Sequence, residues 1–362
     1  MLLKSIIRPL LVVALCATLT ACDSADPDTV LITGGVVVTN QGNFSEGTGS
    51  ITVYDPGTGL ASQLAANFGS VLQSTFLKGD SLYIMANSAS RIDILDVRSG
   101  ARIGQISDVI SPRYMTATGN RAFVTNLFSS DTSFVGGAVT ILDLQSSAVI
   151  DTMHVGNNPE GLAIIGPRLW VADNGFGNGT TLTILDHSSG NRLAALDIGC
   201  FGPRFITVDD EAEMFVLCTG TTIYDENFNP IEEIDGQVAV LDGATGASIV
   251  RIPAEGKIRT AGGVGQDMYH SPETQQLFFV RDAATVVRIN TLSNAITTEF
   301  TVSGDPIGAV AFDHIDERLY LGRVTGFDQT GYVSIHDTAG VEVGRFDAGI
   351  APSHIVFARE EQ

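Results

Sequence analysis

The chain has 362 residues, of which 44% are hydrophobic and 17% are charged, a composition typical of a folded protein that is long enough for two average domains or one large all-β domain. Its formal net charge of -21, with no basic run, argues against a nucleic-acid partner and disfavours anionic membrane surfaces, because both require lysine and arginine to neutralise phosphates. The same acidity fits a salt-adapted source or simply an acidic secreted protein.

The first residues have the pattern of an export signal. Lys4 and Arg8 form a basic region, and residues 10–17 form an apolar run too short to span a bilayer as a stable helix. Leu19-Thr20-Ala21-Cys22 then resembles a bacterial lipobox, in which the cysteine becomes the lipidated N-terminus.

The lipobox predicts a signal peptide at residues 1–21 and a lipid-anchored tether at residues 22–29, with lipidation at Cys22. The alternative is an ordinary secretory signal that ends in small residues. The predicted location is the bacterial cell envelope, with the outer membrane or cell surface favoured over the inner membrane. The N-terminal lipid is then the expected membrane contact.

A short strand pattern that ends in Asp or Asn recurs along the rest of the chain. Its residues alternate with period two, which favours strands packed on both faces by neighbouring sheets. Copies begin 41 to 56 residues apart and occupy residues 51–55, 92–96, 139–143, 182–186, 238–242, 286–290 and 333–337. The longest interval contains an insertion between Thr219 and Gln237.

A second strand pattern precedes each copy and a turn follows it. The preceding runs lie at residues 37–40, 82–87, 123–126, 169–174, 214–218, 277–281 and 319–323. Turns such as Arg98-Ser99-Gly100 offer the positive φ that a tight hairpin needs. Four short strands per repeat, seven repeats and no helical periodicity predict an all-β fold, a seven-bladed β-propeller with four-stranded antiparallel blades. It forms a single domain at residues 30–359, followed by a C-terminal tail at residues 360–362.

The two ends of the domain predict how the ring closes. The N-terminal part supplies three strands of its first blade, around residues 30–38, 51–55 and 60–66, and the C-terminal part offers one spare strand at residues 353–358. Pairing the spare strand with the incomplete blade would remove the open edges.

Two cysteines remain after Cys16 leaves with the signal and Cys22 is lipidated. If residues 205–208 and 214–217 form a hairpin, Cys218 lies at its open end near the segment that carries Cys200. In an oxidising compartment we expect a disulfide between Cys200 and Cys218.

Some strands resemble those of a known family. Val37-Val38-Thr39-Asn40 and Phe123-Val124-Thr125-Asn126, with the Pro159-Glu160-Gly161 type of strand start, are similar to the repeats of YVTN-type, YncE-like seven-bladed propellers over roughly residues 30 to 359. Repeats five to seven depart from the motif and end the second strand in Cys218, Arg281 and Arg323. The resemblance implies an exported or surface protein. A subset of surface lipoprotein propellers captures corrinoids for nutrient uptake, and the chain is similar to these in layout.

Other propeller families fit less well. WD repeats, Trp-docked quinoprotein propellers and Asp-box sialidases all depend on tryptophan, and Trp170 is the single tryptophan in this chain.

Aromatic residues gather in one set of predicted loops. In a propeller, the loops between second and third strands and the loops between consecutive blades emerge on the same face, which we call the aromatic face. These loops carry Phe44, Phe128, Phe134, Phe176, Phe201, Tyr224, Phe228 and Phe327, whereas opposite loops such as residues 78–80, 118–120 and 188–190 carry none. The pattern favours binding of a flat or amphipathic small molecule or a protein partner. The alternative is that the rings fold back and fill their own loops.

The start of each innermost strand is expected to line the mouth of the central channel. The residues at these positions are Gln73, Arg113, Glu160, Arg204, Gln266 and His354, with Ile307 as the apolar exception. Two arginines and a glutamate in a confined mouth could bind carboxylate, phosphate or amide groups. The alternative is that these side chains contact one another and bridging waters and simply fill the channel.

Signals for catalysis or metal binding are weak. The six histidines fall in no metal-ligand spacing. Asp225-Glu226-Asn227-Phe228-Asn229 begins like a calcium loop but has Pro230 where such a loop requires glycine. Residues 262–265 precede a strand rather than a helix, so their glycines indicate room for a close backbone approach rather than a phosphate site.

The sequence therefore predicts a monomeric, non-catalytic protein, with no cofactor or metal, that binds a small molecule or a protein partner on the aromatic face. One alternative is an enzyme of the lyase or lactonase type that uses His354 or His270. Another is an interaction scaffold in the cell envelope.

Overall fold

The computed structural model describes residues 34–129, 135–263 and 265–358. The chain separates into two units, residues 1–30 and 31–362, and all of the described residues belong to the second. The predicted signal peptide, Cys22 and Phe134 lie outside the described residues. Within the described ranges, no helix is long and apolar enough to cross a membrane.

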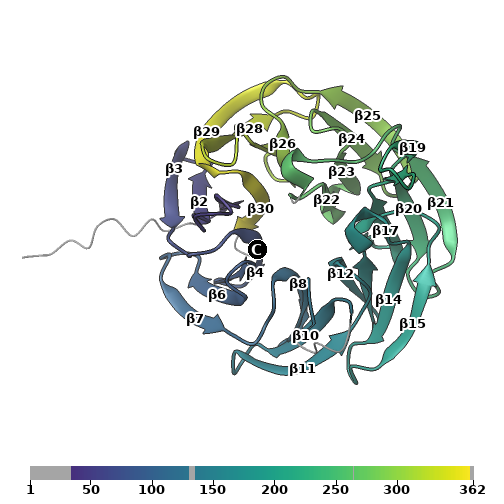
Figure 1. The fold of residues 1–362 in the computed structure, drawn as a ribbon. Coiled ribbons are helices and arrows are strands. Elements are labelled where there is room, and N and C mark those ends of the chain that lie inside the picture. Colours follow the sequence, from purple (N-terminus) through teal and green to yellow (C-terminus); the bar gives the residue numbers. More distant parts are fainter. Residues whose placement is uncertain (1–33, 130–134, 264, 359–362) are drawn as a thin grey trace, which may run out of the picture. The chain divides into compact units, whose positions relative to one another are not determined.

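The described residues form seven antiparallel sheets of four strands, arranged as blades in a ring (Figure 1). In order from the channel outward, the first three blades are β30 (Pro352–Ala358), β1 (Gly35–Asn40), β2 (Ser50–Asp55) and β3 (Leu60–Ala65); β4 (Leu72–Lys78), β5 (Ser81–Ala86), β6 (Arg91–Asp96) and β7 (Arg102–Ile106); and β8 (Pro112–Thr118), β9 (Arg121–Asn126), β10 (Ala138–Asp143) and β11 (Ala148–His154). The prediction of an all-β, seven-bladed propeller is confirmed.

The remaining four blades follow the same order. They are β12 (Pro159–Ile165), β13 (Arg168–Asp173), β14 (Thr181–Asp186) and β15 (Arg192–Asp197); β16 (Pro203–Val208), β17 (Glu213–Cys218), β20 (Gln237–Asp242) and β21 (Ser248–Pro253); β22 (Met268–Ser271), β23 (Gln276–Val280), β24 (Thr285–Asn290) and β25 (Ala295–Thr301); and β26 (Ile307–Asp313), β27 (Arg318–Arg323), β28 (Thr330–His336) and β29 (Glu342–Ile350).

The insertion in the fifth repeat forms an additional hairpin, β18 (Thr221–Tyr224) paired with β19 (Pro230–Ile234). Helical structure in the described residues is limited to the 3-10 turns η1 (Gly175–Gly177), η2 (Ala261–Gly263) and η3 (Pro272–Thr274).

The ring closes through the first blade, as the sequence predicts. β30 pairs antiparallel with β1 from Gly35 opposite Ala358 to Asn40 opposite Pro352. The C-terminal strand therefore supplies the innermost strand of a blade whose other three strands come from the N-terminal part.

The core lies between the blades. Inner strands such as β1 are buried throughout, whereas outer strands such as β15 are mostly exposed. The second strands supply the largest buried rings, including Phe123, Trp170 and Phe215. Because these rings pack between sheets rather than in the channel, side chains at the channel mouth remain available for other contacts.

Loops on the aromatic face form backbone contacts between neighbouring blades. Thr48, between β1 and β2, forms a parallel bridge with Ser70, which leads into the next blade. The expected close backbone approach occurs at Gly265, where an added Cβ would lie 1.6 Å from the carbonyl oxygen of Gly308. A larger residue at position 265 would therefore force the sixth and seventh blades apart.

Candidate ligand-binding site

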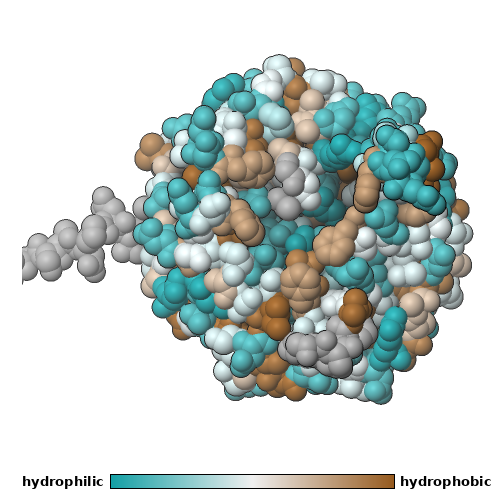
Figure 2. Space-filling view, viewed as in Figure 1, coloured by the Kyte–Doolittle hydropathy of each residue, from teal (hydrophilic) through white to brown (hydrophobic). Residues whose placement is uncertain are grey.

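The predicted aromatic face carries all of the strongly exposed aromatic side chains in the described residues. These are Phe44, Phe128, Phe176, Tyr224, Phe228 and Phe327, which are between 42% and 86% exposed. Their rings do not fold back into the loops that carry them. Phe201 is only partly exposed, and the position of Phe134 is not described. Figure 2 shows this face, with hydrophobic residues around part of a central hollow whose floor is hydrophilic.

A pocket of about 810 Å³ opens on one side of the channel mouth. Its floor includes Arg113, Glu160 and Arg204, the second residues of β8, β12 and β16. Aromatic walls come from Phe176 in η1 and Tyr224 in β18. Three of the predicted channel-mouth residues and two of the predicted aromatic residues therefore border one cavity.

The charged residues of the floor are paired with one another. Arg113 donates from Nη2 to Oε1 of Glu160 on the neighbouring blade at 2.5 Å. Arg204 lies 2.7 Å from Oδ2 of Asp267 and donates to the backbone oxygen of Gly265 at 2.9 Å. All four charged side chains are at least nine-tenths buried. These pairs fix the shape of the floor. Arg113 and Glu160 contact each other, whereas Arg204 pairs with Asp267, which is not one of the predicted channel-mouth residues.

The other three predicted channel-mouth residues do not line this pocket. Gln73 donates from Nε2 to the hydroxyl of Tyr114 at 3.2 Å, and Oε1 of Gln266 accepts from the backbone nitrogen of Ile355 at 2.9 Å. Nδ1 of His354 lies 3.4 Å from the hydroxyl of Thr75. These side chains hold inner strands of different blades together.

Asp267 was missed by sequence reasoning although it is fully buried beside Arg204. Burial raises its pKa because it disfavours the charged form, while the adjacent guanidinium of Arg204 acts in the opposite direction. The contact joins the fifth and sixth blades, and repeat spacing alone carries no signal for an ion pair between blades.

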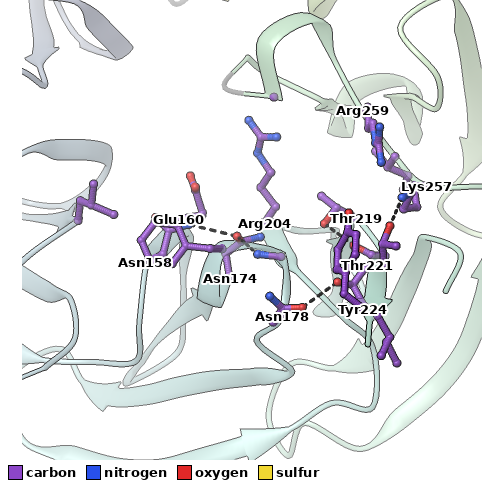
Figure 3. Close-up of a pocket in the computed structure, with 18 of the residues that line it drawn as sticks. Asn158, Glu160, Asn174, Asn178, Arg204, Thr219, Thr221, Tyr224, Lys257 and Arg259 are labelled. Carbon is purple, nitrogen blue, oxygen red and sulfur yellow. Dashed lines mark hydrogen bonds between the residues drawn. The ribbon is translucent and has the colours of Figure 1, made fainter. Parts of the chain in front are cut away.

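Lys257 and Arg259, on the loop from β21 to β22, also line the pocket and were missed. Figure 3 places Glu160 and Arg204 on one side of the pocket and Lys257 and Arg259 on the other. A signal was available, because Lys257 is one of only three lysines in the chain and lies in a loop that was assigned to the aromatic face.

The insertion hairpin forms one wall of the pocket. The segment from Thr219 to Tyr224 borders the cavity, and Thr221 donates to the side-chain oxygen of Asn178 at 2.8 Å. At the foot of the hairpin, Cys200 and Cys218 are joined by a disulfide, with their Cα atoms 6.0 Å apart. The disulfide therefore anchors the strand that leads into this wall.

No group of three or more His, Cys, Asp or Glu side chains in the described part of the chain could hold a metal ion. The segment that begins like a calcium loop is the turn of the insertion hairpin, where the carboxylate of Asp225 accepts from the backbone nitrogens of Asn227 and Asn229. His270, which donates to or accepts from the hydroxyl of Thr207, does not line the pocket.

His354 is expected to make stability depend on pH. Burial lowers its pKa from 6.5 to about 4, so the folded state holds the ring neutral while the unfolded state binds a proton. The contribution of the neutral His354 ring to the free energy of unfolding is complete above pH 6.5 and should be lost as the pH falls towards 4. Urea unfolding of the wild type and His354→Gln at several pH values tests this. The difference in free energy of unfolding between the wild type and the variant should decrease between pH 6.5 and 4. A difference that does not change with pH would exclude the effect.

Comparisons with known proteins give the fold but no family. No family model and no curated protein matches the chain. Among solved structures, it is similar to Kuenenia stuttgartiensis hydrazine synthase at 16% identity, over 80% of this chain and 95% of that chain, with a TM-score of 0.62.

Two further structures cover even more of the chain. A putative 6-phosphogluconolactonase from Bacteroides fragilis is 13% identical over 92% of this chain and 100% of its own, with a TM-score of 0.66. A functionally unknown protein from Desulfotomaculum acetoxidans is 12% identical over 91% of this chain and 100% of its own, with a TM-score of 0.67. At these identities the likeness shows the propeller fold alone.

Proposed function

We propose that the chain is an exported, lipid-anchored and non-catalytic propeller of the YncE-like type that binds a small molecule in the pocket on the aromatic face. The observation that carries the proposal is the convergence of two independent features on one cavity. Exposed aromatic rings, Phe176 and Tyr224, and buried charged groups, Arg113, Glu160 and Arg204, border the same space of about 810 Å³. A concave site with apolar walls and a few fixed polar groups is the usual form of a small-molecule site.

The backbone at Phe176 supports a binding role for its ring. Phe176 has a φ of 56°, in the left-handed region that costs a non-glycine residue about 1 kcal/mol or more. The side chain of Asn174 accepts from the backbone nitrogen of Gly177 at 2.8 Å and helps to hold the turn. The result is a ring that is 61% exposed at the pocket edge, a position that burial in the core does not explain.

The arrangement of charges favours binding over catalysis. Glu160 at the floor contacts Arg113, and Asp267, outside the lining, contacts Arg204, so both buried carboxylates are engaged in ion pairs. His354 and His270, the residues considered for a lyase or lactonase, do not border the cavity. A general base should be within hydrogen-bond reach of a bound substrate, and neither histidine has that position.

Export and lipid anchoring rest on the N-terminal sequence. The basic and apolar regions followed by the lipobox residues 19–22 support both. The disulfide between Cys200 and Cys218 is compatible with an oxidising compartment outside the cytoplasm.

Native mass spectrometry of the lipid-anchored chain, purified in mild detergent from its own source, tests the function. We expect a bound mass in the wild type that is lost from a Phe176→Ala/Tyr224→Ala variant, because removing ring contacts of about 2 kcal/mol weakens binding about 30-fold. Phe44→Ala is the matched control, since this exposed ring lies on the same face but does not line the pocket.

The melting temperature provides the second readout of the same experiment. Phe176 and Tyr224 are exposed, so the double variant should melt close to the wild type. A large loss of stability would mean that the rings serve the fold. A bound mass retained by the double variant would place the ligand elsewhere.

A further inference from the structure

We propose that the ligand of this pocket carries a carboxylate or phosphate next to a flat apolar portion, with the oxyanion held by Lys257 and Arg259 and the flat portion against Tyr224 and Phe176. The inference rests on the proposed function and adds the chemical class of the ligand.

The pocket reverses the charge balance of the chain. The whole sequence has 41 acidic and 20 basic residues, whereas the residues that line the pocket include Glu160 as the acid and four cations, Arg113, Arg204, Lys257 and Arg259. Two carboxylates outside the lining also contact these cations, Asp267 at Arg204 and Glu233 at Lys257. With them included, four cations are opposed by three anions. In a strongly acidic protein, this surplus marks a local site for an anion.

The backbone presents Lys257 and Arg259 on the same side. The nitrogen of Ile258 donates to the carbonyl of Thr219, and the nitrogen of Arg259 donates to the carbonyl of Arg281, both at 2.9 Å. Lys257 and Arg259 both line the pocket, on either side of the buried residue Ile258. The two cations are therefore held by bonds to neighbouring segments on both sides of the loop.

The two cations differ in how strongly they are already engaged. Nζ of Lys257 contacts the hydroxyl of Thr222 and lies 2.9 Å from Oε1 of Glu233. Arg259 is exposed, and its guanidinium makes no hydrogen bond or ion pair with any described residue, although its backbone nitrogen donates to Arg281. Its planar guanidinium can donate two parallel hydrogen bonds to a carboxylate or phosphate, which makes it the main contact for the anion.

The arginines of the floor complement this contact from the other side. Nε of Arg113 and Nε of Arg204 are buried and have no partner among the described residues, although each guanidinium is ion-paired through its terminal nitrogens. The two guanidinium groups are therefore held in place in a site partly shielded from water, where charge interactions are stronger than at an open surface. An anion bound between these two arginines and the pair Lys257 and Arg259 would be attracted by cations on both sides.

A second cavity shows why the anion belongs in this pocket. It has a volume of about 700 Å³ and shares Lys257 and Arg259, but Glu233, Asp282 and Asp305 also line it. Three carboxylates oppose a bound anion there. The two cations therefore form the boundary between a side that accepts an anion and a side that repels one.

Isothermal titration of the full chain with 2-naphthoate and its neutral analogue 2-naphthamide tests the inference, because the two probes share the ring and differ in charge. We expect naphthoate to bind at least about 10-fold more tightly, as for a charge-assisted hydrogen bond. Its affinity should fall as salt rises from about 0.05 to 0.5 M. The same titration with 2-naphthyl phosphate tests a ligand that carries a phosphate in place of the carboxylate.

Matched variants assign the effect to the two cations. Lys257→Gln/Arg259→Gln should lower naphthoate affinity to that of naphthamide and leave naphthamide unchanged. Lys78→Gln is the control, because Lys78 is an exposed lysine at the opposite end of an inner strand and does not line the pocket. It should bind both probes as the wild type does.

Each other outcome overturns the inference in a recognisable way. Equal affinity of both probes for the wild type would exclude the anion class but leave the pocket as a binding site. Equal losses in the double variant and in Lys78→Gln would exclude the assigned cations. If neither probe binds, the ligand class is wrong, and the bound mass in native mass spectrometry still decides the proposed function separately.

Discussion

Deletion of the residues after Ala351 is expected to leave the protein unfolded or aggregated. The deletion removes β30, which pairs with β1 along its whole length and closes the ring. Val37, Val38 and Ile355 are fully buried at this pairing, so the truncated chain would expose them together with an unpaired inner edge. Circular dichroism and size-exclusion chromatography of the truncated protein measure the effect.

A shorter deletion separates closure from a general effect of truncation. Removing only residues 359–362 leaves β30 intact, and this variant should fold as the wild type does. A folded monomer that lacks residues 352–362 would contradict closure by the C-terminal strand.

Asp267→Asn is expected to destabilise the protein by about 3–5 kcal/mol, because breaking a buried pair leaves an uncompensated charge. Asp267 is fully buried and Arg204 is 5% exposed, so water cannot replace the lost carboxylate. Arg204 retains the carbonyl of Gly265 as an acceptor, which does not neutralise its charge. Urea unfolding followed by fluorescence gives the difference in free energy.

A double variant provides the control for this prediction. Arg204→Met/Asp267→Leu replaces both charges by apolar side chains of similar size and should recover much of the lost stability. A loss below about 1 kcal/mol in Asp267→Asn, or a double variant less stable than the single one, would mean that the pair does not act as described.

The fold was predictable because each repeat carries its own local signal. Alternating strands such as residues 139–143 and 182–186 repeat seven times along the chain, so an error in one copy is corrected by the others. The closing strand followed from counting strands at the two ends. Loop positions followed from the fold, and six of the aromatic residues expected in those loops are exposed.

The site was predictable only in part. Arg113, Glu160 and Arg204 were found because they occupy equivalent positions in successive inner strands. Lys257, Arg259 and the β18–β19 hairpin lie in segments that occur in one repeat only, so no other copy indicates where they point. The partner of Arg204 lies on the next blade, and contacts between blades depend on packing that strand periodicity does not encode.

The family, the lipid anchor and the ligand are predictions that rest on different observations. The resemblance to YncE-like repeats rests on strands such as residues 123–126, and the structural neighbours, at 12% to 16% identity, share the fold. Mass measurement of the mature N-terminus would test lipidation of Cys22, because an ordinary secretory cleavage would leave the cysteine without acyl chains.

Binding of a small molecule in this pocket would be seen in a crystal structure of the protein purified from its own source without removal of bound molecules. We expect electron density for a small molecule bounded by Tyr224, Phe176 and Arg204, with an anionic group near Arg259. Density for a ligand on the opposite face, or in the acidic cavity beside Phe327 with this pocket empty, would contradict it.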